Sequence, residues 1–238
     1  MSTLTIILAI IVILLVYYIY TVMNAVPTVA SKLDLSTFQP PVDPKLIKNP
    51  YSTNYTIGVW VYITNYTKNI GQFLTYGDKK TPSKTIFSLN MDTTTPKLTC
   101  SVLTTNPNGL QTVNLTAETD AFPIQKWVYV VVSVSNFIEC YLNGQFVNAV
   151  QIDRQGAPAT IIAEADVASG ATFSFGSNIP VVLTGVSRWD TPLSSGDVYN
   201  NYSKGNGYEA GLFGPGYKIS LNVKRGTDTY NLPIIGKT

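Results

Sequence analysis

The sequence predicts an all-β protein, a two-sheet antiparallel jelly-roll sandwich preceded by one transmembrane helix. Tyr, Thr, Asn, Val and Ile, which favour β-structure, are plentiful in the 238-residue chain. From Ile57 onward, short strand-like runs alternate with turn sequences, without a long helical pattern between them. Parallel architecture is excluded because it needs helices between its strands. A single long apolar segment stands at the N-terminus.

That N-terminal segment, residues 4–23 (LTIILAIIVILLVYYIYTVM), contains no charged side chain. A helix of this length extends about 30 Å, the thickness of a bilayer's hydrocarbon core. Tyrosines gather near one end, as in the aromatic belt of a membrane interface: Tyr17, Tyr18 and Tyr20. A cleaved signal peptide is the alternative, but its positive n-region is missing. We therefore expect an uncleaved anchor over residues 1–23, with a lipid bilayer as its partner.

The basic residues near this anchor all follow it. Lys32, Lys45 and Lys48 come after the segment and none precedes it, so the positive-inside rule places the C-terminal part on the cytosolic side. The alternative is a domain at the cell surface, with glycosylation at four N-x-S/T sites. These sites are Asn54, Asn65, Asn114 and Asn201.

Residues 24–50 are predicted to form a proline-rich tether. Five prolines favour extended backbone: Pro27, Pro40, Pro41, Pro44 and Pro50. Fully extended, this tether could reach about 80 Å. We expect the jelly-roll domain over residues 51–206 and a C-terminal arm over residues 207–238. Within the arm, KISLNVK followed by a turn at 225–228 predicts a hairpin.

Strand candidates follow one another through the domain. They include IGVWVYI (57–63), GQFLTYG (71–77), KTIFSLN (84–90), KLTCSVLT (97–104), LQTVNLT (110–116), TFSFG (172–176) and PVVLTGVSRWD (180–190). One short helix is predicted within residues 193–207, with Ser194 or Ser195 as its cap. Its buried face would carry Leu193, Val198 and Tyr202.

The centre of the domain is QKWVYVVVSVSNFIECYLNGQF (125–146). One strand runs over 127–134 and a second returns over 137–142, with Cys140 on one face and Glu139 and Tyr141 on the other. Asn143-Gly144 is the favoured pair for a type I′ turn. Cys100 and Cys140 are interpreted as free buried thiols, although a disulfide stays open for a secreted domain.

This pattern resembles the laminin-G-like, concanavalin A-like jelly-roll family. WVYVVVSV and IECYLNGQ (127–134, 138–145) are similar to its central Trp strand and Y-x-N-G hairpin. IGVWVYI, TFSFGS (172–177) and LTGVSRWDTPLSSGDVYNNYSKG (183–205) resemble other strands and the terminal helix. The resemblance covers roughly residues 52–206. It implies a fold that hosts lectins, hydrolases and adhesion modules, and does not by itself assign a function.

We expect no enzyme, metal or cofactor. The chain has no histidine, which excludes Ser-His-Asp and Cys-His catalysis and His-based zinc sites. Glycosidases need two carboxylates in one cleft. The acidic residues are scattered instead: Glu118, Asp120, Glu139, Asp153, Glu164 and Asp166.

A carbohydrate site on this fold would use an aromatic platform with polar neighbours, and the candidate ligand-binding residues are Trp189, Tyr141 and Asp190. Each has a purely structural interpretation as well. Trp60 and Trp127 fit core positions, Asn143 is explained by its turn, and Asp190 suits a turn before Thr-Pro.

Two functions follow. The first is a non-enzymatic, membrane-anchored structural protein, since anchor, tether and sandwich resemble minor capsid proteins of large DNA viruses, linking the virion inner membrane to the capsid shell. Its partners would be other capsid proteins. The alternative is a lectin-like attachment or adhesion module. A nucleic-acid partner is not expected, because the formal charge is only +2.

Overall fold

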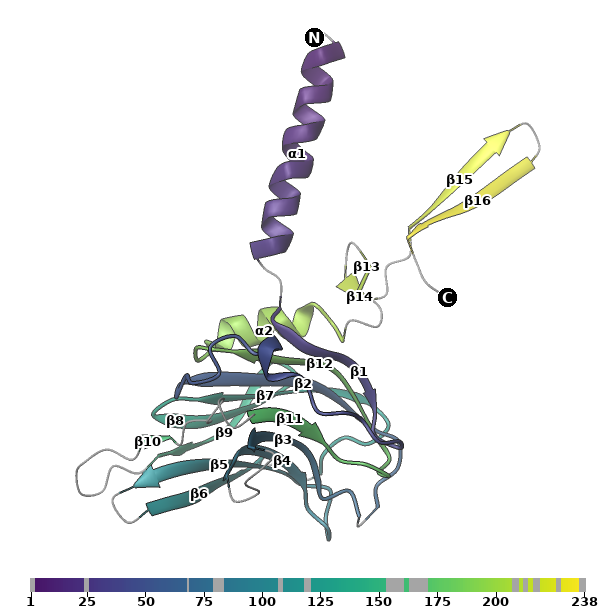
Figure 1. Ribbon diagram of the computed structural model, residues 1–238. Coiled ribbons are helices and arrows are strands. Elements are labelled where there is room, and N and C mark those ends of the chain that lie inside the picture. Colours follow the sequence, from purple (N-terminus) through teal and green to yellow (C-terminus); the bar gives the residue numbers. More distant parts are fainter. Residues whose placement is uncertain are drawn as a thin grey trace.

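Two stacked antiparallel sheets form the body of the protein (Figure 1). The computed structural model describes residues 3–23, 26–67, 69–78, 84–106, 109–117, 121–152, 161–162, 171–206, 210–211, 214–215, 219–225 and 228–235. The predicted all-β sandwich is therefore confirmed.

The first sheet has six strands in the order β1-β12-β2-β7-β8-β9. Their bounds are β1 Thr28–Asp34, β12 Val181–Trp189, β2 Tyr55–Ile63, β7 Trp127–Val134, β8 Phe137–Leu142 and β9 Gln145–Gln151. Between β8 and β9, Asn143 and Gly144 have φ of 51° and 79°, as the predicted type I′ turn requires.

The second sheet also has six strands, in the order β10-β5-β4-β3-β11 with β6 paired to β5. Their bounds are β10 Ile161–Ile162, β5 Leu98–Asn106, β4 Thr85–Met91, β3 Gln72–Asp78, β11 Ala171–Phe175 and β6 Gly109–Thr116. Two further pairs form two-stranded sheets: β13 Ala210–Gly211 with β14 Gly214–Pro215, and β15 Ile219–Arg225 with β16 Asp228–Ile235. The hairpin predicted in the C-terminal arm corresponds to β15 and β16.

The core lies between the two sheets. Alternate residues of β7 and β8 enter it, among them Val130, Ile138 and Cys140, as their period of two requires. Cys100 of β5 enters from the opposite sheet, and both cysteines are buried free thiols. The expectation of free buried thiols is confirmed for the described structure.

Residues 28–50 differ from the predicted free tether. β1 pairs along β12, and Leu35, Val42 and Ile47 are buried in the core. A short 3-10 helix, η1, spans Pro44–Leu46. The prolines bound the extended segment without preventing pairing, because β1 occupies the sheet edge and contains no proline itself.

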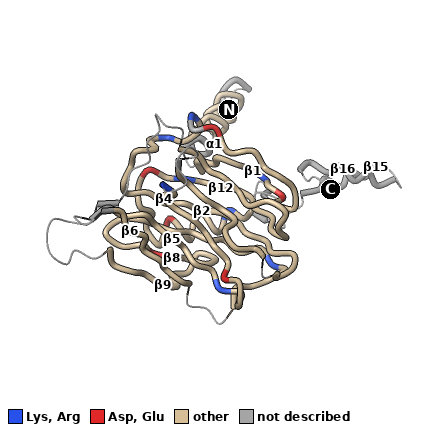
Figure 2. The backbone as a smooth tube through the Cα atoms, turned by 60° about the horizontal axis from the view of Figure 1, so that its bottom comes forward, with Lys and Arg blue, Asp and Glu red and all other residues tan. Residues whose placement is uncertain are grey.

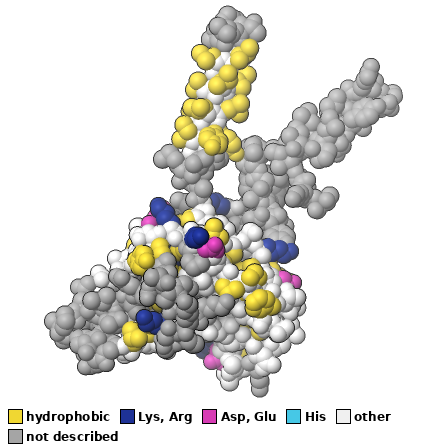
Figure 3. Space-filling view, viewed as in Figure 1, with side chains coloured by type: hydrophobic (Ala, Val, Ile, Leu, Met, Phe, Trp, Pro, Cys, Tyr) yellow, Lys and Arg dark blue, Asp and Glu magenta, His cyan; other side chains and the backbone are white. Residues whose placement is uncertain are grey.

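Helix α1 (Thr3–Met23) precedes the sandwich and projects away from it (Figure 1). Its described side chains, residues 7–19, are apolar apart from two tyrosines, and Figure 3 shows them as a continuous hydrophobic surface. Within the part of the chain that the structure describes, no helix combines the length and apolarity needed to cross a bilayer. The predicted transmembrane span is therefore not confirmed.

Candidate functional site

Helix α2 (Ser195–Ser203) lies across the outer face of the first sheet (Figure 1). Ser194 caps it in a capping box with Asp197, whose carboxylate accepts from the Ser194 backbone and hydroxyl. Val198 is fully buried against the sheet, and Tyr202 packs there too. This is the helix predicted within residues 193–207.

Beneath α2 lies a second, separate hydrophobic cluster. It contains Trp60, Tyr129, Val131, Tyr141 and Val198. Trp60, which was predicted at a core position, is buried, but it lies in this outer cluster and not between the two sheets, and Trp127 is half-buried against the same cluster. An alternating pattern shows that two faces differ, but a sheet covered by a helix on its outer side is apolar on both faces.

Strand β12 contains a bulge at this face. Its register against β2 shifts between Thr184 and Ser187, and Gly185 there has φ of 61°. A glycine in this left-handed conformation is typical of a bulge, and the extra residue bends the strand. The bend opens a pocket between β1, β12 and the end of α2.

The pocket has a volume of about 430 Å³. It is lined by Val26, Thr28, Ser31, Lys32, Trp60, Tyr129, Thr184, Gly185, Ser187, Asn201, Lys204, Gly205 and Asn206. The lining thus includes two aromatic residues, two asparagines, four serines and threonines and two lysines, and no Asp or Glu lines it among the described residues.

Four lining residues occupy one row across the sheet. Lys32 pairs with Thr184, Thr184 with Trp60, and Trp60 with Tyr129. The Thr184 hydroxyl lies 2.5 Å from the carbonyl oxygen of Ser31 and 3.2 Å from that of Asn206, and it donates its one proton to either of them. It thus joins β1 to the chain that leaves α2, which closes one wall of the pocket.

The indole of Trp60 presents its edge to the pocket. Its two neighbours are Tyr129, with ring centroids 5.0 Å apart, and Tyr202, stacked at 5.5 Å. The Cδ1 edge, next to Nε1, faces Gly185. Nε1 is the hydrogen-bond donor of the indole.

The three candidate residues from the sequence do not line this pocket. Tyr141 is buried, and its hydroxyl donates to Glu139 Oε2 (2.9 Å) and lies 3.4 Å from Ser195 Oγ. Burial raises the pKa of Tyr141. Trp189 lies over Gly58, where an added Cβ would approach its ring to 3.0 Å.

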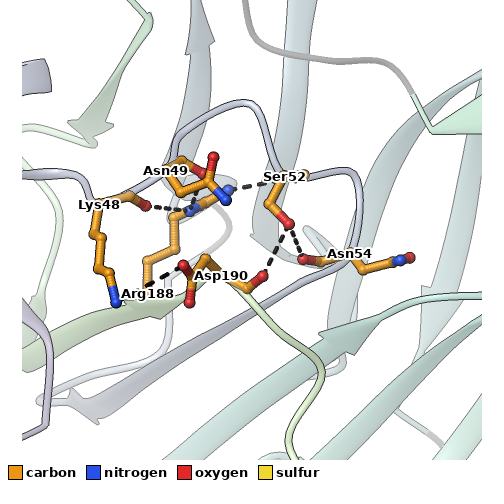
Figure 4. Close-up of polar contacts among 6 residues, drawn as sticks. All are labelled: Lys48, Asn49, Ser52, Asn54, Arg188 and Asp190. Atoms are coloured by element: carbon orange, nitrogen blue, oxygen red, sulfur yellow. Dashed lines mark hydrogen bonds and ion pairs between the residues drawn. The ribbon is translucent and has the colours of Figure 1, made fainter.

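Asp190 belongs to a different contact group, drawn in Figure 4. Its carboxylate lies 4.0 Å from Lys48 Nζ, and its carbonyl accepts from Ser52 Oγ. The neighbouring Arg188 is buried and donates to the carbonyl oxygens of Lys48 (3.1 Å) and Asn49 (3.3 Å). This group fixes a loop to β12, which is a structural task.

The membrane-interface tyrosines are partly described. Tyr17 and Tyr18 of α1 are exposed to 48% and 66%. The side chain of Tyr20 lies outside the described residues. Their contact with lipid stays a prediction.

Acidic residues give no catalytic pair in the described structure. Glu139 accepts a hydrogen bond from Tyr141. Glu118, Asp120, Asp153, Glu164 and Asp166 lie outside the described residues. Among the residues described, no group of three His, Cys, Asp or Glu side chains could hold a metal. Figure 2 shows few charges of mixed sign along the described backbone, without a basic stripe. The absence of catalysis stays a prediction.

A sandwich of two antiparallel sheets with a short helix on its outer face defines the jelly-roll class. A family model described as the concanavalin A-like lectin/glucanases superfamily matches residues 41–199. The chain belongs to this superfamily, as the resemblance in the sequence implied. A comparison with curated proteins returned no match.

Solved structures with a similar fold include binding domains of botulinum neurotoxins and of a mosquitocidal protein. The receptor binding domain of botulinum neurotoxin C/D mosaic serotype has a TM-score of 0.54 at 11% identity, covering 85% of this chain and 53% of its own. The botulinum serotype D ligand binding domain, solved with N-acetylneuraminic acid, has a TM-score of 0.53 at 11% identity, and the match covers 85% of this chain and 53% of that domain's chain. The binding domain of Paraclostridial Mosquitocidal Protein 1 has a TM-score of 0.50 at 13% identity, and the match covers 72% of this chain and 42% of that domain's chain. The chain thus spans about half the length of these structures, and the likeness shows the fold alone.

The pocket was missed by reasoning from the sequence. Its residues come from five separate stretches, and only the strand register brings Lys32 beside Thr184 and Trp60. One local signal existed, since Gly185 interrupts the alternation of PVVLTGVSRWD and a glycine inside a strand suggests a bulge.

Proposed function

We propose that this chain is a carbohydrate-binding, lectin-like module attached to a lipid bilayer by its N-terminal helix. The pocket between β1, β12 and the end of α2 is the proposed binding site. The observation that carries this proposal is the lining of the pocket, which combines aromatic edges with convergent amide, hydroxyl and ammonium groups.

Such a lining suits a polyol. Sugar hydroxyls both donate and accept hydrogen bonds, and the lining supplies donors in Trp60 Nε1 and in the two lysines. Asn201 supplies an amide whose oxygen already accepts from Lys204 Nζ (3.1 Å), so its position is fixed before a ligand arrives. Fixed polar groups beside apolar surface are the usual composition of small-molecule sites.

The fold is compatible with this proposal. One structure of similar fold was solved with N-acetylneuraminic acid, which shows that a domain of this architecture can hold a sugar.

Attachment to a bilayer is proposed on the surface of α1. Its large apolar side chains from Ile7 to Ile19 are 46–67% exposed, which is unfavourable in water. Acyl chains are the partner of matching chemistry, because the helix is apolar on all sides and residues 4–23 carry no charge. We place the sandwich on the cytosolic side, following the lysines after the helix.

The capsid role stays a prediction. Neither the family model nor the three solved structures above describes a capsid protein. A repeating lattice around the native protein would support that role, and its sandwich would then contact other proteins.

The experiment is a glycan array probed with the full chain in uncharged detergent micelles, repeated with Asn201→Ala. We expect selective binding by the wild type and at least tenfold weaker binding by the variant. Asn65→Ala, an exposed asparagine outside the pocket, is the matched control and keeps wild-type binding. Absence of binding to all glycans, or equal binding by Asn201→Ala, contradicts the proposal.

A further inference from the structure

The pocket lies at the foot of helix α1. The helix ends at Met23, and Val26, three residues on, already lines the pocket. Three successive Cα–Cα steps span at most about 11 Å. The chain itself therefore keeps the pocket within this distance of the end of the helix, whatever direction the helix takes.

This placement fixes the depth of the pocket relative to a bilayer that holds α1. Thr28, Ser31 and Lys32 of β1 also line it, so its wall is the first structured segment after the helix. The polar headgroups are the layer next to the hydrocarbon core, and a wall that begins here meets that layer. Figure 3 shows several Lys and Arg side chains on the side of the sandwich nearest α1.

The charge of the lining is positive. Lys32 and Lys204 contribute two ammonium groups, and the described lining holds no Asp or Glu. The C-terminal end of the α2 dipole opposes them with about half an elementary charge. Asp34, outside the lining, interacts with Lys32 and adds one negative charge, so the opposing charge stays smaller than two. The net field in the pocket thus favours an anionic group.

The two lysines approach from opposite walls. Lys32 is fixed on β1 by pairing with Thr184, while Lys204 follows α2 and donates to Asn201 Oδ1. Trp60 and Asn201 line the same pocket. The arrangement provides an anion contact at the lysines and hydroxyl contacts on the aromatic and amide side.

We infer that this pocket takes the headgroup of an anionic membrane lipid, a phosphorylated polyol of the inositol phospholipid class, from the same bilayer that holds α1. The inference rests on the proposed function, because it assumes that the pocket binds polyols and that α1 meets lipid. The anionic lipids of the cytosolic leaflet agree with the orientation expected from the lysines.

The test titrates the full chain, in uncharged detergent micelles, with short-chain phosphatidylinositol 4-phosphate by calorimetry. We expect saturable binding that weakens about tenfold or more in the double variant Lys32→Gln/Lys204→Gln. Lys97→Gln, an exposed lysine outside the pocket, is the matched control and binds as the wild type. Equal binding by the double variant overturns the inference.

Three further ligands distinguish a phosphorylated inositol lipid from other anionic lipids and from a soluble inositol phosphate. Unphosphorylated phosphatidylinositol and short-chain phosphatidylserine, the latter anionic but without a polyol, should bind at least tenfold more weakly. Soluble inositol 1,4-bisphosphate carries the same headgroup without acyl chains and should also bind more weakly, and equal affinity overturns the assignment to lipid. If a neutral glycan binds the wild type, but phosphatidylinositol 4-phosphate does not bind or binds the wild type and the double variant equally, the proposed function stands and this inference falls. If neither glycan nor lipid binds, both fall.

Discussion

Arg188 shows what one buried charge does in this protein. Its guanidinium is almost inaccessible and reaches four loop carbonyls, at 3.1 to 3.5 Å, while lying over the rings of Tyr55 and Tyr76. Burial lowers the pKa of Arg188 from its ordinary value. One side chain thus supplies hydrogen bonds to four carbonyls of the loop after η1.

Replacing Arg188 with Met should therefore destabilise the fold. The loop carbonyls would lose their donor, and a buried unsatisfied group costs about 1–3 kcal/mol. We expect the free energy of unfolding in urea to fall by about 3 kcal/mol. The control is Lys48→Ala, whose side chain is 82% exposed and 4.0 Å from Asp190, with an expected loss below about 0.5 kcal/mol. A loss under about 1 kcal/mol for Arg188→Met would contradict this account.

A second prediction about single residues concerns the two buried thiols. Burial raises the pKa of Cys140 from 9.0 to about 12 and that of Cys100 well above 9.0. The folded state therefore holds these protons more tightly, and its stability is lost as pH rises from about 9 toward 12. At pH 8 neither thiol should react with a maleimide until urea unfolds the chain. Rapid labelling of the native protein would show that the thiols are accessible.

Much of this detail is readable from the sequence, but not all. The alternation of side chains along β8 correctly predicted that Cys140 and Tyr141 lie on opposite faces of the sheet, and the Asn143-Gly144 pair correctly predicted the type I′ turn. The burial of Trp60 was predicted, but its place in a cluster on the outer face was not, because α2 covers that cluster. Tertiary contacts decide which of the two apolar faces of the first sheet packs against the second sheet. The local sequence pattern does not contain this information.

Helix α2 is the element on which the pocket depends. Its last turn and the residues after it contribute Asn201, Lys204 and Asn206 to the lining. Its first turn is held by the hydroxyl of Ser194, which accepts from the Asp197 backbone at 3.2 Å. A loosened helix should therefore weaken ligand binding as well as the fold.

Ser194→Ala tests this link. Loss of an N-cap costs about 1 kcal/mol, and we expect that decrease in the free energy of unfolding together with weaker ligand binding. Ser203→Ala is the control at the other end of the same helix, where the exposed hydroxyl donates to the Tyr199 carbonyl. Its expected effect is within about 0.5 kcal/mol. Equal losses from both variants would mean that the capping box has no special role.

The elements themselves were predicted unequally. The short helix, the central hairpin and the last hairpin carry their own capping and turn residues, so local sequence sufficed. β1 carries no alternating apolar pattern, because it is an edge strand whose side chains are mostly exposed or half-buried. Only its partner β12 makes it a strand, and residues 24–50 were therefore assigned to a tether.

For the whole molecule, attachment and folding should be separable. Deleting residues 1–23 removes α1 but leaves β1 and both sheets intact. We expect the shortened chain to leave the membrane pellet for the supernatant, with a melting temperature within a few degrees of the full chain. A shortened chain that stays with the membrane would contradict attachment through α1.

Deleting residues 1–34 is the comparison. It removes β1 as well, which exposes the edge of β12 and one wall of the pocket. This second deletion should aggregate or melt lower and should lose ligand binding. Equal behaviour of the two deletions would show that β1 is dispensable and that the pocket lies elsewhere.

The most direct test of the central claim is where a bound saccharide lies. The measurement is a crystal structure of the chain with the glycan or headgroup that binds most tightly. The account predicts electron density in the pocket, with ligand oxygens within hydrogen-bond distance of Trp60 Nε1 and the Asn201 amide. Ligand density on the outer face of the second sheet, with this pocket empty, would contradict it.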